Sequence, residues 1–275
     1  MARRLTMKPA VLLMLGLSVF VPAASSAQRR SRPPAPPAPR AATPTQRAER
    51  PVPFQVGETL TYDVSWSSYV TAGTVVVAVK EKKPSFGSTA YYIVAEARPT
   101  TLLSKLYTLY YKLDTLVDAY TLLPQRGSLY SEEGKRHRFK ATRFDRGMQK
   151  AFFEYQSTTT VKSDFAIPAF TQDALSALYV LRAIPLKPGD RMTMPVSDDG
   201  RNYRLQIEVG APERVKTPLG EVSAWKVKPV LTDDTGQAVG RNLAVWISDD
   251  ARRRPVKFQA ELAVGSFNLL LREAR

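Results

Sequence analysis

Apolar and polar residues alternate along most of the chain after residue 53. Between Glu58 and Trp66, the apolar side chains of Leu60, Tyr62, Val64 and Trp66 occupy every second position, with polar residues between them. Successive side chains of a strand point to opposite faces, so this period of two predicts a strand with one buried face.

Strand-like runs of the same kind recur to the end of the chain. Turn sequences rich in Gly, Pro and Asp separate many of them, such as Asp198-Asp199-Gly200 and Asp233-Asp234-Thr235-Gly236. Many short strands at this spacing favour antiparallel meanders. The runs are 71–80, 90–98, 110–118, 129–132, 135–144, 148–155, 158–162, 191–196, 203–209, 222–230, 243–248, 256–263 and 267–271.

Two segments break this pattern with helical spacing. Thr171 is placed to cap a helix that has Asp173 in its first turn and apolar residues at 175, 178, 179 and 181, and that must end near Pro185. Thr101 to Leu109 also has helical spacing but leads directly into a strand pattern, so it predicts one loose turn.

The order of these elements, about nine strands, a helix and about five strands, predicts a mainly β protein. We expect a large curved antiparallel sheet, a half-barrel or open barrel, wrapped around one or two helices. Residues 54–275 are long enough to bury one sizeable core, so a single β-rich domain is preferred. Two tandem subdomains joined near residues 185–190 are the alternative.

The first 53 residues are not part of that pattern. Residues 1–27 have a basic start, an apolar run over 11–21 and the small residues Ser25-Ser26-Ala27, which predict a signal peptide cleaved after Ala27 and export to the periplasm. A retained membrane anchor is the alternative, but the run is only half of the roughly 20 residues that cross a bilayer. Residues 28–53 hold eight prolines and six arginines, which predict a disordered Pro/Ala/Arg-rich linker.

Composition narrows the chemistry. The chain has no cysteine and one histidine, so disulfides, thiolate nucleophiles and multi-histidine metal sites are excluded, and we expect no cofactor. Of the net charge of +15, +3 lies in residues 1–27, +5 in residues 28–53 and only +7 in the remaining 222 residues. Export and the absence of an aromatic stacking platform exclude nucleic acid as the partner.

An ordered series of short motifs covers most of the predicted domain, and it resembles the bacterial exported family called domain of unknown function 3108 (DUF3108). The motifs are Phe54-x-Val-Gly-Glu-x-Leu-x-Tyr-x-Val-x-Trp66, Gly73, Leu123-Pro124, Arg143-Phe144-Asp145, Asp173-Ala-Leu-Ser-Ala-Leu-Tyr179 followed by Arg182, Pro188-Gly189-Asp190, Thr217-Pro218-Leu219-Gly220, Trp246-Ile247-Ser248-Asp249-Asp250 and Arg254-Pro255-Val256.

The resemblance implies a periplasmic or cell-envelope β domain with no assigned reaction and no catalytic residue to carry over. It also implies an architecture similar to the half-barrels of lipoprotein carriers, which shelter an acyl chain. Fold alone does not fix function, so this last step is an analogy.

Two patterns in the sequence have the residue types found in enzyme active sites. Ser223-Ala-Trp-Lys226 has the spacing of serine enzymes with a lysine base, but it falls in a strand, where positions three apart point to opposite sides. Four acidic doublets, at 132–133, 198–199, 233–234 and 249–250, have the residue type of a glycosidase pair, but three of them lie at turns. We therefore expect no catalytic residues and no metal site.

Two groups of side chains are candidate binding residues. Arg136, Arg138 and Lys140 share one face of a predicted strand, where they form either an anion-binding row or an ordinary solvated outer face. The aromatic residues form either the lining of an apolar ligand site or ordinary core. The candidates for the apolar lining are Tyr62, Trp66, Tyr111 and Tyr179.

These observations leave three functions open. The preferred one is a non-enzymatic envelope domain that binds an amphiphilic or lipid-like component. The second is a structural or adaptor module that docks on peptidoglycan, another anionic envelope polymer or an envelope protein complex through its basic linker. A hydrolase that uses acidic residues is the third and the least favoured.

Overall fold

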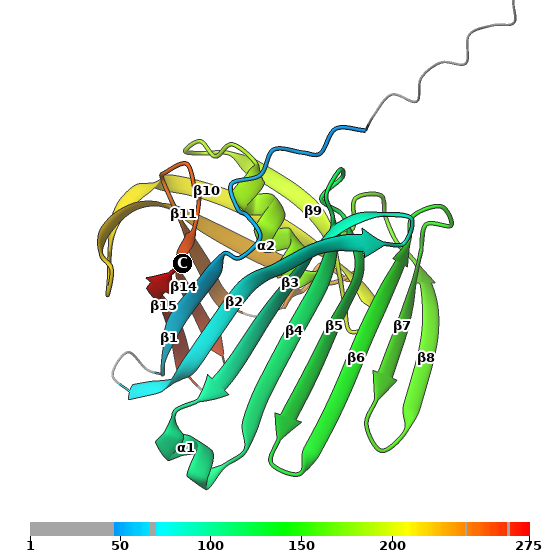
Figure 1. Ribbon diagram of the computed structural model, residues 1–275, viewed down its shortest axis with the longest axis horizontal. Coiled ribbons are helices and arrows are strands. Elements are labelled where there is room, and N and C mark those ends of the chain that lie inside the picture. The colour runs from blue at the N-terminus through cyan, green and yellow to red at the C-terminus, as the bar shows by residue number, and fades with distance from the viewer. Residues whose placement is uncertain (1–46, 67–69, 240, 263–264) are drawn as a thin grey trace, which may run out of the picture. The chain divides into compact units, whose positions relative to one another are not determined.

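The structure is a computed structural model that describes residues 47–66, 70–239, 241–262 and 265–275. The predicted signal peptide, its cleavage site and the linker up to residue 46 lie outside the described residues. Among these residues the chain forms fifteen strands and two helices (Figure 1). They are β1 (Thr59–Trp66), β2 (Val70–Ser85), β3 (Ser88–Pro99), α1 (Thr101–Leu106), β4 (Leu109–Asp118), β5 (Pro124–Glu133), β6 (Arg136–Asp145), β7 (Lys150–Gln156), β8 (Thr160–Ala166), α2 (Ala174–Ala183), β9 (Arg191–Asp198), β10 (Arg201–Thr217), β11 (Gly220–Thr232), β12 (Ala238–Val239), β13 (Arg241–Ser248), β14 (Pro255–Leu262) and β15 (Gly265–Ala274).

All the strands belong to one antiparallel sheet, which confirms the predicted fold class. The order is β8-β7-β6-β5-β4-β3-β2-β1-β15-β14-β13-β11-β10-β9, with β12 attached to β11. The sheet thus has two free edges and is not a closed barrel. Eight strands precede α2 and seven follow it, not nine and five; β12, with two residues, is too short to give an alternating pattern.

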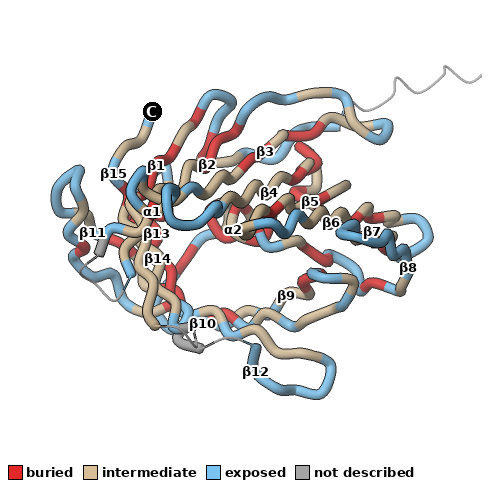
Figure 2. Tube along the Cα trace, turned by 90° about the horizontal axis from the view of Figure 1, so that it is seen from below, coloured by how far each residue is buried: buried red, intermediate tan, exposed pale blue. Residues whose placement is uncertain are grey.

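The sheet curls so strongly that its two edges approach each other (Figure 2). Beyond β8, Gln172 forms a parallel bridge with Val196 of β9. The side-chain amide of Asn202 on β10 also donates a hydrogen bond to the carbonyl oxygen of Ala166 at the end of β8, at 2.7 Å. The result is an open half-barrel with α2 on its concave side.

Helix α2 ends as predicted but begins later than predicted. Its cap is Asp173, not Thr171: a side-chain oxygen of Asp173 accepts the backbone N–H of Ser176, and the Ser176 hydroxyl accepts the N–H of Asp173. This reciprocal pair is a capping box, with Ser176 in the place of the usual Glu or Gln. Thr171 instead donates its hydroxyl to the carbonyl of Pro168 and lies outside the helix.

The inner face of α2 packs on the sheet through apolar side chains and one buried ion pair. Arg182 is fully buried and donates two hydrogen bonds to the carboxylate of Glu58, at 2.6 and 2.8 Å. It also donates to the carbonyls of Arg252 and Arg253, at 3.2 and 3.0 Å. These contacts fix the C-terminal end of the helix against the start of β1 and the β13–β14 turn.

The second predicted helix is present as the short α1, between β3 and β4. Thr100 caps it by accepting the N–H of Leu103, and the helix ends at Leu106. None of its residues is buried, so it adds nothing to the core.

Residues 47–53, at the end of the predicted linker, run along the domain. The Glu49 carboxylate pairs with Lys82 at 2.5 Å, and the Arg50 N–H donates to the carbonyl of Ala119 at 3.1 Å. Val52 packs against the main apolar cluster. The segment just before β1 is therefore bound to the sheet through polar and apolar contacts.

Candidate functional site

The strand pairing shows which side chains share the concave face. Thr115 of β4 lies opposite Gly127 of β5, which lies opposite Thr142 of β6. The Thr115 hydroxyl donates to Asp173, the cap of α2, at 2.6 Å, so this row lies beneath the helix. A Cβ on Gly127 would approach the Asp173 carboxylate to 2.8 Å, so a glycine is needed where the helix meets the sheet.

Helix α2 covers only one half of this face. Along β1, Leu60 and Tyr62 are each 1% exposed, Val64 is half-buried and Trp66 is 45% exposed, although all four share one side of the strand. Neighbouring strands show the same gradient. The uncovered half, called here the concave strip, consists of the half-buried apolar residues Val64, Val75, Ala95, Leu113, Leu129, Phe258 and Leu269.

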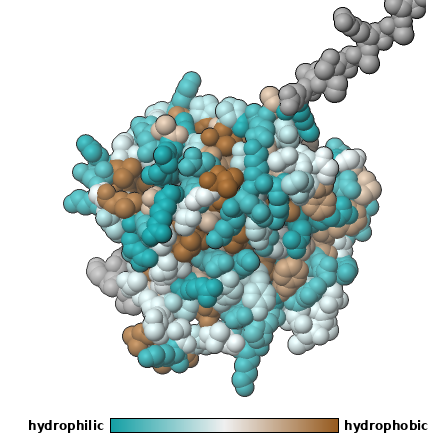
Figure 3. Space-filling model, viewed as in Figure 1, coloured by the Kyte–Doolittle hydropathy of each residue, from teal (hydrophilic) through white to brown (hydrophobic). Residues whose placement is uncertain are grey.

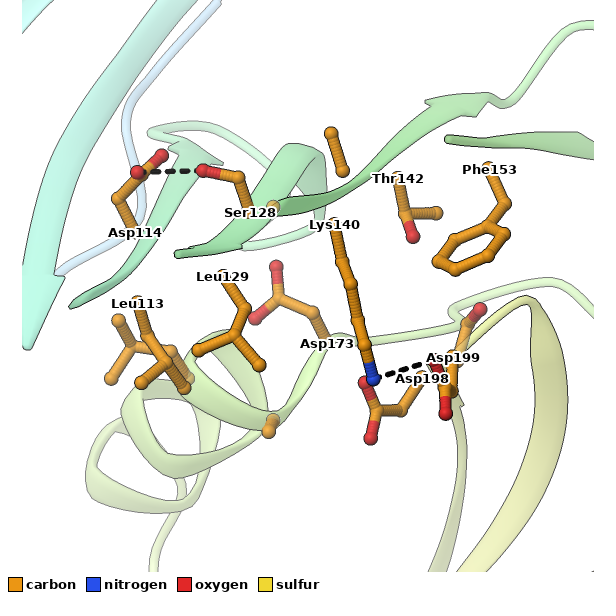
Figure 4. Close-up of a pocket in the computed structure, with 15 residues that line it drawn as sticks. Leu113, Asp114, Ser128, Leu129, Lys140, Thr142, Phe153, Asp173, Asp198 and Asp199 are labelled. Atoms are coloured by element: carbon orange, nitrogen blue, oxygen red, sulfur yellow. Dashed lines mark hydrogen bonds and ion pairs between the residues drawn. The ribbon is translucent and has the colours of Figure 1, made fainter. Parts of the chain in front are cut away.

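A cavity of about 140 Å³ lies between the concave strip and the first turn of α2. Leu113 and Leu129 of the strip, Lys140, Asp173 and Asp199 are among its lining residues (Figure 4). The hydrogen bond between Asp114 and Ser128 lies on the opposite side of these strands in this view. The cavity is smaller than the roughly 300 Å³ of small ligand pockets, so it can hold a polar group but not a chain.

Lys140 is the one Lys or Arg among the described residues that line this cavity, and it is already paired. The ammonium of Lys140 lies 2.6 Å from the Asp199 carboxylate in the β9–β10 turn. Burial raises the pKa of Asp173, and the hydrogen bonds from Ser176 and Thr115 oppose this shift in part. Asp173 thus serves as the helix cap and is not a free acid for proton transfer.

The predicted aromatic residues separate into two pairs. Tyr62 and Tyr179 both lie in the buried core: Tyr62 donates its hydroxyl to the carbonyl of Pro255 at 2.8 Å, and the Tyr179 ring packs edge-on against Phe54 at 4.7 Å. Trp66 is the last residue of β1 and Tyr111 lies near the start of β4, so both lie at the end of these strands that is opposite to Glu58, where the C-terminal end of α2 is held. The four residues therefore do not line a single cavity.

Trp66 and Tyr111 have different surroundings. The Trp66 ring stacks on Phe267 of β15, with centroids 6.5 Å apart. The Tyr111 hydroxyl donates to Glu133 at 2.5 Å, and burial together with this carboxylate raises the pKa of Tyr111 to about 12.

The predicted cationic row lies on the concave side of β6, in line with Thr142, rather than on an outer face. Arg138 pairs with Glu133, and Lys140 pairs with Asp199. Arg136 is exposed and forms no ion pair with any described residue. Two of the three charges of the row are therefore paired with carboxylates of the same domain.

The acidic doublets mostly serve local structure, although those at 198–199 and 233–234 both lie near Tyr203. Asp233 accepts the N–H groups of Thr235 and Gln237 in its own turn, and Asp249 accepts the indole N–H of Trp225 at 2.8 Å. Ser223 lies in strand β11, as the spacing argument required. Among the described residues, no group of three acidic or His side chains has the arrangement of a metal site.

The concave strip is the part of the site that the sequence did not identify. Its members belong to the predicted alternating runs, but alternation does not tell which face is concave or where a helix covers it. Tyr62 and Val64 share a face of one strand, yet only Tyr62 is fully covered.

The fold and the site define a class: open antiparallel half-barrels that hold a helix at one end of the concavity and leave apolar surface uncovered at the other. Within this class the chain belongs to the family described as protein of unknown function (DUF3108), whose model matches residues 61–272. This confirms the resemblance drawn from the ordered motifs. Glu58 and Arg182, both within those motifs, form the buried ion pair that holds α2.

Solved structures with a similar course of the chain are distant in sequence. A β-barrel-like protein of the family DUF1849 from Brucella abortus is 13% identical, with 80% of this chain and 97% of that chain covered and a TM-score of 0.49. A candidate exported protein with a YmcC-like fold from Bacteroides fragilis is also 13% identical, with 83% and 100% covered and a TM-score of 0.32. A candidate lipoprotein from Parabacteroides distasonis is 9% identical, with 83% and 100% covered and a TM-score of 0.36. No curated protein matches the chain. Neither described helix is long and apolar enough to cross a membrane.

Proposed function

We propose that this protein is a non-enzymatic domain of the cell envelope that binds a single-chain amphiphile, with the apolar chain lying along the concave strip. The observation that carries the proposal is the uncovered half of the concave face. All of its apolar side chains are only half-buried, and four of them, Val75, Ala95, Phe258 and Leu269, pack against the core. Burial of apolar area contributes roughly 25 cal/mol per Å².

The two ends of the strip suit the two parts of such a ligand. At one end, the cavity beside Asp173 is lined by Thr142 and by the ion pair of Lys140 with Asp199, and these polar groups face the position proposed for the head group. At the other end, the strip reaches Trp66, where the concave face meets solvent. An apolar chain on the strip would replace water there without moving α2.

The proposed location is the periplasm, and the support for it is the sequence of residues 1–53. A signal peptide cleaved after Ala27 and a linker over 28–53, whose last residues 47–53 are bound to the sheet, would precede a single domain of residues 54–275, and the part of the linker before residue 47 would extend its reach. Mass spectrometry of the exported protein tests this, since it gives the N-terminal residue directly.

Two neighbouring valines of β2 provide a matched test of the binding site. Val75 and Val76 are both half-buried, but Val75 lies on the concave strip opposite Tyr62, whereas Val76 lies on the convex face opposite Thr61. We expect Val75→Lys to weaken binding of a fluorescent fatty-acyl probe by about tenfold or more, because the lysine ammonium would lie against the apolar chain of the bound probe. Val76→Lys should leave binding unchanged.

The outcomes separate the proposal from its rival. If the unmodified protein neither binds the probe nor carries lipid in native mass spectrometry, amphiphile binding is wrong. Equal effects of the two valine substitutions would place the ligand elsewhere. A salt-sensitive interaction with peptidoglycan that is lost when residues 28–53 are deleted would favour the adaptor function instead.

A further inference from the structure

Helix α1 presents apolar side chains to solvent. Leu102 is 71% exposed and Leu106 is 78% exposed, and Tyr107, which follows the helix, is more than half exposed. No residue of α1 is buried, so these side chains do not support the fold. Adjacent exposed leucines that contribute nothing to a core mark an interaction surface.

Further apolar side chains lie at the same end of the sheet. Leu109 begins β4 directly after α1, and Trp66 ends β1; both are exposed large apolar residues. The connection before α1 is close to this region of β2, since the Thr100 N–H donates to the carbonyl of Ala72 at 3.0 Å. We call Trp66, Leu102, Leu106, Tyr107 and Leu109 the open rim. Figure 3 shows apolar side chains at the lower edge of the molecule, where Figure 1 places α1.

The charges beside the open rim are positive. Lys105 lies within α1, Lys135 lies in the β5–β6 turn and Arg136 begins β6. This turn is bonded to the region of α1, because the Gly134 N–H donates to the carbonyl of Thr108 at 2.8 Å. These three cations form no ion pair with any described residue.

The two acidic residues of the β5–β6 hairpin, by contrast, are occupied. Glu133 accepts hydrogen bonds from Arg138 and Tyr111, and Glu132 accepts the hydroxyl of Tyr130. The rim therefore combines exposed Leu, Trp and Tyr side chains with a net positive charge, because Lys105, Lys135 and Arg136 outnumber Glu132, and Glu133 is paired with Arg138. This is the composition of surfaces that lie in the interface of an anionic bilayer.

We infer that the open rim docks on the surface of an anionic phospholipid bilayer, with Leu102 and Leu106 inserted and Lys105, Lys135 and Arg136 against the phosphates. A protein partner would fit the apolar residues alone, but the net positive charge around them favours a phosphate surface. Docking of the rim would orient the open end of the concave strip toward the lipid, because Trp66 of the rim follows Val64 of the strip on the same side of β1. Docking is carried by the rim residues and does not depend on amphiphile binding by the strip.

The experiment measures cosedimentation of the protein with vesicles. The full chain is expressed with its own leader, and the exported protein is purified. It is mixed with vesicles of phosphatidylglycerol and phosphatidylethanolamine, and with vesicles of phosphatidylcholine alone. Every variant has the same N-terminal segment, so a difference between variants cannot come from residues 1–46.

Three variants define the expected result. Leu102→Asp with Leu106→Asp should weaken binding to anionic vesicles at least about tenfold. Arg136→Glu should weaken it by about fivefold or more and reduce its salt dependence. Phe86→Asp is the matched control: Phe86 is 59% exposed but lies in the β2–β3 turn at the other end of the sheet, so binding should not change.

Three outcomes would overturn the inference. In the first, the unmodified protein does not bind vesicles. In the second, the Phe86 variant and the leucine variant bind anionic vesicles equally well. In the third, the unmodified protein binds anionic and phosphatidylcholine vesicles equally well. If the leucine variant instead loses a stoichiometric complex with one envelope protein in the absence of lipid, the rim is a protein interface. Circular dichroism verifies that each variant is folded, and the acyl-probe titration of Val75→Lys separates failure of docking from failure of strip binding.

Discussion

The buried ion pair between Glu58 and Arg182 makes a sharp prediction about stability. Arg182 donates four hydrogen bonds, two to Glu58 and two to the carbonyls of Arg252 and Arg253. Arg182→Met would leave the carboxylate of Glu58 buried without a partner. Removing one member of a buried pair costs about 3–5 kcal/mol, and each abandoned carbonyl adds about 1 kcal/mol. The expected loss, about 5–7 kcal/mol, is comparable with the whole stability of many domains.

A double-mutant cycle isolates the pair itself. Glu58→Leu removes the other partner, and the variant with both substitutions contains no buried charge at this position. Because each single substitution leaves one uncompensated charge, the double variant should be less destabilised than the sum of the singles by at least about 2 kcal/mol. Arg182→Lys keeps the charge but not the paired geometry, so it should fall between Arg182→Met and the unmodified protein.

Urea unfolding followed by tryptophan fluorescence, to which the buried Trp246 contributes, measures these free energies. If Arg182→Met does not fold, the cycle is carried out with Arg182→Lys and Glu58→Gln, which change fewer contacts. Additivity within about 0.5 kcal/mol would show that the two groups are not energetically coupled. The conclusion that this ion pair holds α2 against the sheet would then be wrong.

Two further predictions concern Asp173, which caps α2 on the concave face, and Gly200, which packs against Phe153. Because burial raises the pKa of Asp173, its contribution to stability is fully present below its unfolded pKa of about 3.8 and is lost as the pH rises through the folded pKa. As the pH rises from the unfolded to the folded pKa, Asp173→Asn should therefore become more stable relative to the unmodified protein. Urea denaturation at several pH values measures this difference in stability, and a difference that does not change with pH would contradict the prediction. Gly200→Ala would bring a Cβ to 2.9 Å from the Phe153 ring and should cost about 1–3 kcal/mol. Gly189→Ala, also at positive φ but with open space around it, should cost less in the same unfolding assay.

The strands could be predicted from the sequence because alternation is a local property. The run from Glu58 to Trp66 corresponds closely to β1. Strands β2 and β10 extend beyond their predicted ends, over residues such as Lys82 and Lys216, where charged residues interrupt the alternation but the backbone pairing continues. Exposed parts of strands need not show an apolar period.

The site could not be predicted because it depends on where α2 crosses the sheet. That position is fixed by contacts between residues far apart in sequence: Glu58 with Arg182, and Thr115 with Asp173. The same contacts decide that Tyr62 is core and that Val64 is half-exposed. The cap at Asp173 escaped prediction for a local reason, since Ser176 takes the place usually held by Glu or Gln.

The first and last strands of the described chain are neighbours in the middle of the sheet. Thr59 and Arg275 exchange backbone hydrogen bonds of 3.1 and 3.0 Å, and β1 pairs with β15 along its length. Strands β1–β8 and β9–β15 are each built from neighbours in the chain, but the two sets share strand hydrogen bonds mainly through this central pair. During synthesis from the N-terminus, β1 keeps an open edge until β15 has been made. Completion of the sheet therefore has to wait for the last strand, and a chain without β15 would leave β1 as a free edge that can pair with other chains.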